Sequence, residues 1–169
     1  MTDPLEFTGQ RVLVIGGSSG IGNGIAHGFR QRGASVTVTG TRPDFGDYLE
    51  AEDSDFTGLD YRQLDLTDRD AADRLAEGFG PLDVLVLCQG TVAYGRKEFE
   101  MDTFRRIIDV NLNSVGQVTV EQQRVFAKHR VDLAGLVVGI ACLDISRDQR
   151  RQCAEQIIFK RSHVANDRH

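Results

Sequence analysis

Short apolar runs alternate along this chain with segments in which apolar residues recur every three or four positions. The runs predict strands near residues 11–15, 35–39, 60–64, 83–88 and 135–141, and the periodic segments predict helices near 21–31, 69–79 and 99–129. A chain that alternates strand and helix in this way forms a parallel sheet with helices on both faces. We therefore predict an α/β fold, a Rossmann-like doubly wound parallel sheet of about five strands.

The turn between the first strand and the first helix consists almost wholly of small residues. It reads Gly-Gly-Ser-Ser-Gly-Ile-Gly over residues 16–22. Glycines let the backbone turn sharply and approach a ligand closely, and the following helix would direct its unpaired N–H groups at an anion. The candidate phosphate-binding residues are Gly16, Ser18, Ser19, Gly20, Ile21 and Gly22. The alternative is an ordinary strand-to-helix turn.

The glycine spacing Gly-x-x-x-Gly-x-Gly differs from the Gly-x-Gly-x-x-Gly of the commonest dinucleotide fingerprint. It resembles the nucleotide loop of the short-chain dehydrogenase/reductase family, and the resemblance covers about residues 8–142. It implies a dinucleotide cofactor and oxidoreductase chemistry on a small-molecule carbonyl or alcohol substrate.

The end of the second predicted strand bears on the choice of cofactor. In nucleotide-binding folds an acidic side chain there binds the adenosine ribose, whereas a basic one accommodates a 2′-phosphate. The chain has Gly40, Thr41 and Arg42 at this place, with no acid before Asp44. We therefore favour NADP over NAD, with Arg42 as the candidate ligand of the 2′-phosphate. A solvated loop arginine is the alternative.

Two further positions follow strands at the same predicted edge of the sheet. Asp65 matches the family's aspartate beside the adenine ring, but it also fits a turn or capping residue, and Thr67 with Asp70 resembles a capping pair for the next helix. After the fourth strand the family usually has Asn-Asn-Ala-Gly, where this chain has Leu-Cys-Gln-Gly. Gly90 keeps the position beside the cofactor, and the two amides are absent.

The family's catalytic residues are matched only in part. Asn111 lies in an apolar stripe and resembles the helix asparagine that helps hold a water in the proton relay; a structural asparagine with satisfied hydrogen bonds is the alternative. Cys142 stands where the family has a serine. Gln156 and Lys160 are the nearest match to the family's Tyr-x-x-x-Lys motif. The chain therefore has the lysine of this motif, but a glutamine stands in place of the tyrosine that the family uses as general acid and base.

The composition changes after about residue 142 to a polar, basic tail unlike the family's. We predict a dinucleotide-binding domain over residues 1–143 and a divergent tail over residues 144–169. A shifted reading frame or a truncation of the gene near residue 142 would explain the tail. The implied function is an NADP-dependent short-chain oxidoreductase with impaired catalysis; the alternatives are a non-catalytic NADP-binding module and a truncated remnant. An uncovered fifth strand would favour self-association, and so a homo-oligomer.

Length, charge and composition bear on the number of domains, the partners and the location of this chain. Its 169 residues suffice for one domain, and its net charge of -5 argues against general nucleic-acid binding. No apolar run is long enough to span a bilayer, and the three cysteines have no metal-ligand spacing, so neither a membrane span nor a metal site is predicted. The N-terminus has no basic start followed by an apolar run, so we expect a cytoplasmic chain.

Overall fold

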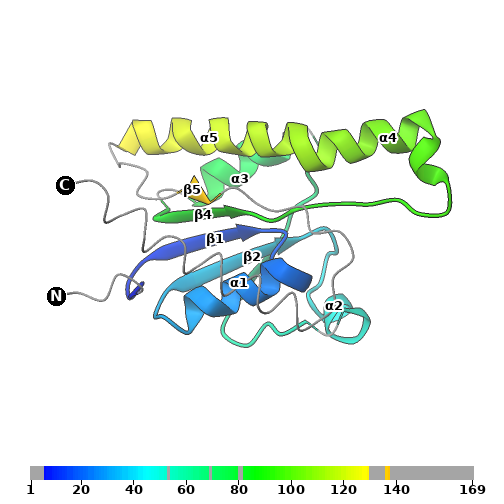
Figure 1. Cartoon of the computed structure of the whole chain (residues 1–169). Coiled ribbons are helices and arrows are strands. Elements are labelled where there is room, and N and C mark those ends of the chain that lie inside the picture. The colour runs from blue at the N-terminus through cyan, green and yellow to red at the C-terminus, as the bar shows by residue number, and fades with distance from the viewer. Residues whose placement is uncertain (1–5, 53, 69, 80–81, 130–135, 138–169) are drawn as a thin grey trace, which may run out of the picture.

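A parallel β-sheet forms the centre of the computed structural model, which describes residues 6–52, 54–68, 70–79, 82–129 and 136–137 (Figure 1). The strands are β1 (Arg11–Ile15), β2 (Ser35–Gly40), β3 (Asp60–Gln63), β4 (Val84–Leu87) and β5 (Leu136–Val137). They lie in the order β3-β2-β1-β4-β5, with every neighbouring pair parallel. This order is that of one half of a doubly wound nucleotide-binding sheet, and it confirms the predicted fold class.

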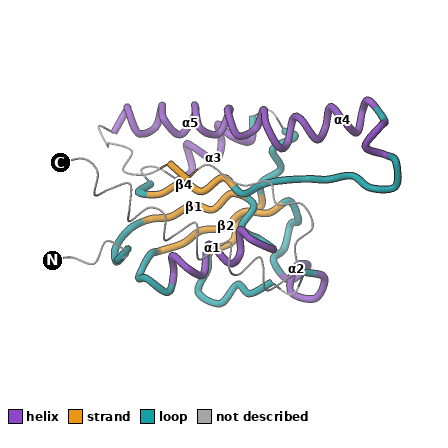
Figure 2. Tube along the Cα trace, in the orientation of Figure 1, coloured by secondary structure: helices purple, strands orange, loops and turns teal. Residues whose placement is uncertain are grey.

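The helices of the described residues are α1 (Gly20–Arg30), α2 (Gly46–Ala51), α3 (Ala71–Phe79), α4 (Met101–Ile108) and α5 (Ser114–His129). Those that pack on the sheet cover both of its faces. Figure 2 shows α1 on one side of the sheet and α3 with α5 on the other. In Figure 1, α4 continues the line of α5 beyond the carboxyl ends of the strands.

Successive residues of the central strands face the two helical layers in turn. Val12 and Val14 belong to the core cluster that includes α1, whereas Leu13 and Ile15 belong to the cluster that includes α3 and α5. All four side chains are at most 1% exposed. Because side chains alternate between the faces of a strand, an unbroken apolar run requires cover on both faces, as the sequence pattern indicates.

The predicted helix over residues 99–129 is interrupted. A 3-10 turn (Lys97–Phe99) precedes α4, and a π turn (Asp109–Asn113) separates α4 from α5. The apolar stripe of this segment is not a core face throughout, because Phe104 is 48% exposed and Leu112 is 64% exposed. In the described part of the chain, α4 contributes no buried residue.

The start of α3 corrects a second expectation. The helix begins at Ala71, two residues after the predicted start near residue 69. The Asp70 N–H donates to Asp68 Oδ1 at 3.0 Å rather than to Thr67, and the Thr67 hydroxyl donates to Asp65. The fifth predicted strand is described only at Leu136–Val137, and residues 138–141 and the predicted tail lie outside the described residues. Among the helices of the described segments, none has the length and apolar character needed to cross a membrane.

Candidate cofactor site

The loop after β1 folds back against its own helix. Gly16 has a φ of 72° and Gly20 a φ of 57°, left-handed values that side chains with a Cβ rarely adopt. A Cβ on Gly22 would lie 2.2 Å from the Gly16 carbonyl oxygen, and a Cβ on Gly16 would lie 2.7 Å from the backbone of Gln89. The loop therefore has a close backbone packing that only glycine permits.

Backbone N–H groups of the loop join it to Thr39 of β2, whereas Ser19 leaves the first turn of α1 without a side-chain cap. The buried Ser18 donates its N–H to the Thr39 carbonyl oxygen at 3.2 Å, and the Gly16 N–H donates to the Thr39 hydroxyl at 3.2 Å. Ser19 has an extended backbone and makes no side-chain hydrogen bond to the first turn of α1. That turn, which includes the buried Ile21, therefore retains the unpaired N–H groups with which every helix begins.

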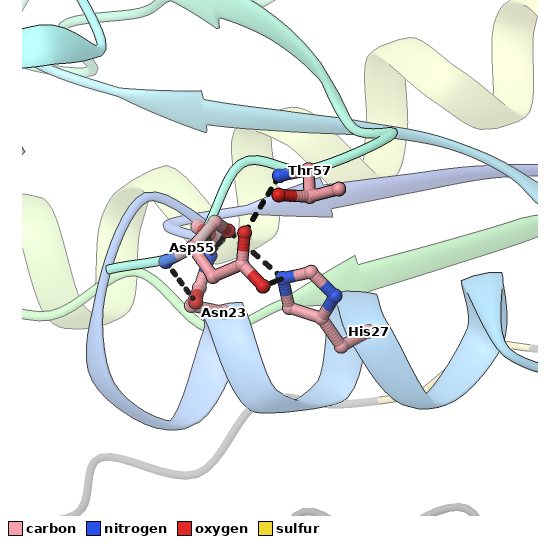
Figure 3. A network of polar contacts seen from close by, with 5 residues as sticks. Asn23, His27, Asp55 and Thr57 are labelled. Carbon is pink, nitrogen blue, oxygen red and sulfur yellow. Dashed lines mark hydrogen bonds and ion pairs between the residues drawn. The ribbon is translucent and has the colours of Figure 1, made fainter. Parts of the chain in front are cut away.

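Asn23 ties the loop to the segment that precedes β3 (Figure 3). Its side-chain amide donates to the carbonyl oxygens of Gly17 at 3.2 Å and of Asp55 at 2.9 Å, and its Oδ1 accepts from the Asp55 N–H at 3.2 Å. We call this set of three bonds the Asn23–Asp55 clamp. The sequence pattern does not predict this clamp; its signal in the sequence is a polar residue among the buried positions of α1.

Two neighbours support the clamp. His27 Nε2 lies 2.8 Å from the Asp55 carbonyl oxygen and 3.6 Å from its carboxylate, and the Asp55 carboxylate accepts from the Thr57 N–H at 2.7 Å (Figure 3). The hydrogen bonds from Thr57 hold the pKa of the Asp55 carboxyl below its usual 3.8. The segment before β3 is thus anchored on α1 beside the glycine loop.

Arg42 follows β2, as predicted, but its side chain already has partners. Its Nη2 lies 3.1 Å from Glu52 Oε1, its Nη1 donates to the Asp47 carbonyl oxygen, and its guanidinium carbon lies 4.4 Å from the centre of the Tyr48 ring. Its backbone is held as well, since the Arg42 N–H donates to the Tyr48 hydroxyl at 3.0 Å and the Tyr61 hydroxyl donates to the Arg42 carbonyl oxygen. The arginine is therefore a fixed part of the β2 end.

The two tyrosines around Arg42 have opposite pKa shifts. Burial raises the pKa of Tyr48, but hydrogen bonds at its hydroxyl, including those from Thr41 and the Arg42 backbone, outweigh burial, and the pKa lies below 10.0. Burial, and then the charge of Tyr48, raise the pKa of Tyr61 well above its usual value, and Asp44 and Asp47 add to the rise. The surroundings of Arg42 are thus rich in acceptors and negative charge.

Asp65 and Gly90 follow β3 and β4. Asp65 Oδ1 accepts from the Thr67 N–H at 2.9 Å and from the Thr67 hydroxyl at 2.8 Å, so Asp65 is the turn residue that the sequence left open as an alternative. The adenine contact stays a prediction. Because the strands are parallel, Gly16, Arg42, Asp65 and Gly90 all follow the carboxyl ends of strands and lie along one edge of the sheet.

Asn111 lies in the π turn, close to Gly90. Its Oδ1 accepts from the Thr91 N–H at 2.7 Å and its Nδ2 donates to the Thr91 carbonyl oxygen at 2.9 Å, so both polar ends of the side chain are paired. This geometry agrees with the structural asparagine left open by the sequence, and π turns are frequent at functional sites. The relay role stays a prediction. Lys160, Cys142 and Gln156 lie outside the described residues.

A dinucleotide fits the described edge. The turn at residues 16–22, which we call the glycine cradle, is packed so closely that a Cβ at Gly16 would overlap the Gln89 backbone and a Cβ at Gly22 would overlap the Gly16 carbonyl oxygen. Beside it, Gln89 donates from Nε2 to the Ser114 hydroxyl at 3.1 Å, while its buried Oε1 has no hydrogen-bond partner within the described ranges. A glycine turn at the N-terminus of a helix, with a buried acceptor close by, suits the phosphates and ribose of a nucleotide.

The strand order and the glycine turn beside the switch between β1 and β4 define a Rossmann-like α/β fold. Comparison with known proteins is more specific, because the model of the short chain dehydrogenase family matches residues 10–151. The chain belongs to this family.

Curated relatives and solved structures agree with this membership. The chain is 32% identical over 119 residues to (+)-borneol dehydrogenase 2 from Salvia officinalis, a match that covers 66% of this chain and 42% of that protein. It is 35% identical over 121 residues to the cyclic-di-GMP-binding biofilm dispersal mediator protein of Escherichia coli strain K12, covering 70% and 49% of the two chains. A third relative is 3beta-hydroxysteroid dehydrogenase 2 from Eggerthella lenta, 29% identical, with 88% and 59% covered.

Among solved structures, a short-chain type dehydrogenase/reductase from Mycobacterium ulcerans matches with a TM-score of 0.60 and 30% identity, covering 74% of this chain and 49% of that one. The chain thus spans about half the length of the relatives it matches.

Proposed function

We propose that this chain binds NADP along the carboxyl edge of its sheet and acts as an oxidoreductase on a small-molecule carbonyl or alcohol, with low catalytic power. The observation that carries the proposal is the glycine cradle, in which a Cβ on Gly22 would overlap the Gly16 carbonyl oxygen and a Cβ on Gly16 would overlap the Gln89 backbone, so that neither position accepts a side chain. Bound NADP supplies or accepts a hydride.

Different residues along this edge would contact different parts of the cofactor. The loop glycines with Ser18, Ser19 and Ile21 would lie against the pyrophosphate, and Arg42 would take the 2′-phosphate. Asp65 would contact the adenine and Gly90 would lie beside the ribose, as the family resemblance implies. NAD is the less favoured cofactor because no acid occupies residues 40–43 at the end of β2.

The catalytic part of the proposal rests on fewer residues. Asn111 and Lys160 are the proposed members of the proton relay, whereas Gln156, at the place of the family's tyrosine, cannot act as a general acid or base. A positioned proton donor contributes about 10²- to 10⁴-fold to the rate, so we expect turnover reduced by about that factor. The same replacement favours a second candidate, a non-catalytic NADP-binding module.

Two further proposals concern the oligomeric state and the cellular location of the chain. A homo-oligomer is supported by apolar side chains on the surface around α4, where Phe99 is 78% exposed and Met101 is 60% exposed. The cytoplasmic location stays a prediction from the N-terminal sequence.

Titration with NADPH and NADH tests the binding proposal. The wild-type chain should bind NADPH more tightly than NADH, and Arg42→Ala should lower NADPH affinity by about tenfold, or about 1.4 kcal/mol, while leaving NADH binding almost unchanged. Arg105→Ala is the matched control, because Arg105 pairs with Asp102 on the exposed surface of α4. Tighter binding of NADH by the wild type, or equal effects of the two variants, would refute the proposed cofactor choice.

A turnover assay with a panel of ketones and alcohols then separates the two candidate functions. Slow but measurable oxidation of NADPH with one of the ketones supports the oxidoreductase. Saturable NADPH binding with no turnover supports the non-catalytic module.

A further inference from the structure

The pairing of Arg42 with Glu52 has a consequence for the choice of cofactor. We propose that Glu52 is a specificity-determining residue that competes with the 2′-phosphate of NADP for the Arg42 guanidinium and so weakens the preference for NADP over NAD. The inference rests on the proposed NADP binding. It assigns a role to Glu52, which follows the last residue of α2 and lies outside the glycine cradle.

The geometry gives Glu52 the place that a phosphate oxygen would need. Its Oε1 lies 3.1 Å from Arg42 Nη2, while Nη1 donates to the Asp47 carbonyl oxygen and the guanidinium lies over the Tyr48 ring at 4.4 Å. The arginine is thus oriented by neutral partners on two sides and by one carboxylate. An incoming phosphate has to share or replace that carboxylate to reach Nη2.

Exposure makes the replacement possible. The Arg42 side chain is 35% exposed and that of Glu52 is 39% exposed. Ion pairs with this degree of solvent contact contribute little to stability, so Glu52 weakens phosphate binding without preventing it. Its charge also acts directly, because it adds to the negative charges of Asp44 and Asp47 that the chain places at the end of β2.

Removal of the charge from Glu52 should therefore favour the phosphorylated cofactor alone. We expect Glu52→Gln, which preserves the shape of the side chain, to tighten NADPH binding by about threefold to tenfold, equivalent to about 0.7 to 1.4 kcal/mol. NADH lacks the 2′-phosphate, so its affinity should stay within about twofold. A carboxylate that instead bound the unphosphorylated ribose would give the opposite result, a loss of NADH affinity.

The experiment measures dissociation constants for NADPH, NADH and 2′,5′-ADP by calorimetric titration at low salt, with thermal unfolding of each variant recorded alongside. Glu77→Gln makes the same change of charge on the exposed surface of α3, which packs on the other face of the sheet from α1, and is the control. In the Arg42→Ala background, Glu52→Gln should lose most of its effect on NADPH affinity, because the guanidinium for which Glu52 and the 2′-phosphate compete is absent.

The results distinguish this inference from the proposed function. The wild-type ratio of NADPH to NADH affinity tests the proposed cofactor choice, whereas the change of that ratio in Glu52→Gln tests the competition. A rise in Glu52→Gln that is absent in Glu77→Gln and in the double variant supports the inference. An unchanged ratio, an equal rise in Glu77→Gln, a loss of NADH affinity, or no nucleotide binding by any variant would overturn it.

Discussion

Replacement of Gly22 by alanine probes the glycine cradle directly. The added Cβ would lie 2.2 Å from the Gly16 carbonyl oxygen, about 1.2 Å short of the 3.4 Å at which ordinary contacts begin, and 3.0 Å from the Gly17 Cα. These neighbours are backbone atoms of the loop, so the loop itself must move by about 1 Å to relieve the overlap.

The energetic cost has two opposing parts. Overpacking of this kind costs about 1–3 kcal/mol, and the better helix propensity of alanine returns up to about 1 kcal/mol. We expect a net loss of about 1–2 kcal/mol in the free energy of unfolding, which for a chain of this size lowers Tm by roughly 2–8 °C.

Nucleotide binding should suffer more than stability, because movement of the loop backbone also displaces the N–H groups that would donate to the pyrophosphate. We expect NADPH affinity to fall by at least about tenfold. Gly116→Ala is the control: Gly116 lies in α5 with nothing within 4 Å of its added Cβ, so the variant should be as stable as the wild type or slightly more stable. A Gly22→Ala chain that matches the control in both Tm and NADPH affinity would refute the packing argument.

Two further predictions concern the segment that the clamp holds. Asn23→Ala removes three buried or half-buried hydrogen bonds, so we expect a loss of about 1–3 kcal/mol in urea denaturation together with weaker NADPH binding; wild-type values for both would contradict the role of the clamp. The pKa of Asp55 is lowered in the folded chain, so its stabilising effect is present above pH 3.8 and is lost as pH falls through the folded-state pKa. Asp55→Asn should flatten the acid side of the stability curve, whereas Asp73→Asn on the exposed surface of α3 should not; equal slopes in Asp55→Asn and wild type would disprove this linkage.

Most of the sheet and its glycine turn could be predicted from the sequence. The apolar runs at residues 12–15 and 84–87 are covered on both faces, so burial leaves an unbroken signal in the sequence. The turn at residues 16–22 can also be predicted from the sequence, because left-handed φ values and close backbone packing both require glycine. Local composition reports these features because each one constrains residues that are neighbours in the chain.

Features that depend on distant partners could not be predicted in the same way. The Asn23–Asp55 clamp joins residues 32 positions apart, and the partners of Arg42 come from the acidic segment after β2, which carries no periodic pattern of its own. The expected Thr67 cap was wrong because the Asp70 N–H donates to the Asp68 carboxylate instead. The π turn around Asn111 is also hidden, since its apolar spacing resembles that of an unbroken helix.

Titration of NADPH into the wild-type chain tests the central claim most directly. We predict saturable binding at one site per chain, displacement of NADPH by 2′,5′-ADP, and at least about tenfold weaker binding in Gly22→Ala. A folded wild-type chain that shows no saturable heat with millimolar NADPH, or that binds it as well after Gly22→Ala, would contradict the assignment of the glycine cradle to the cofactor.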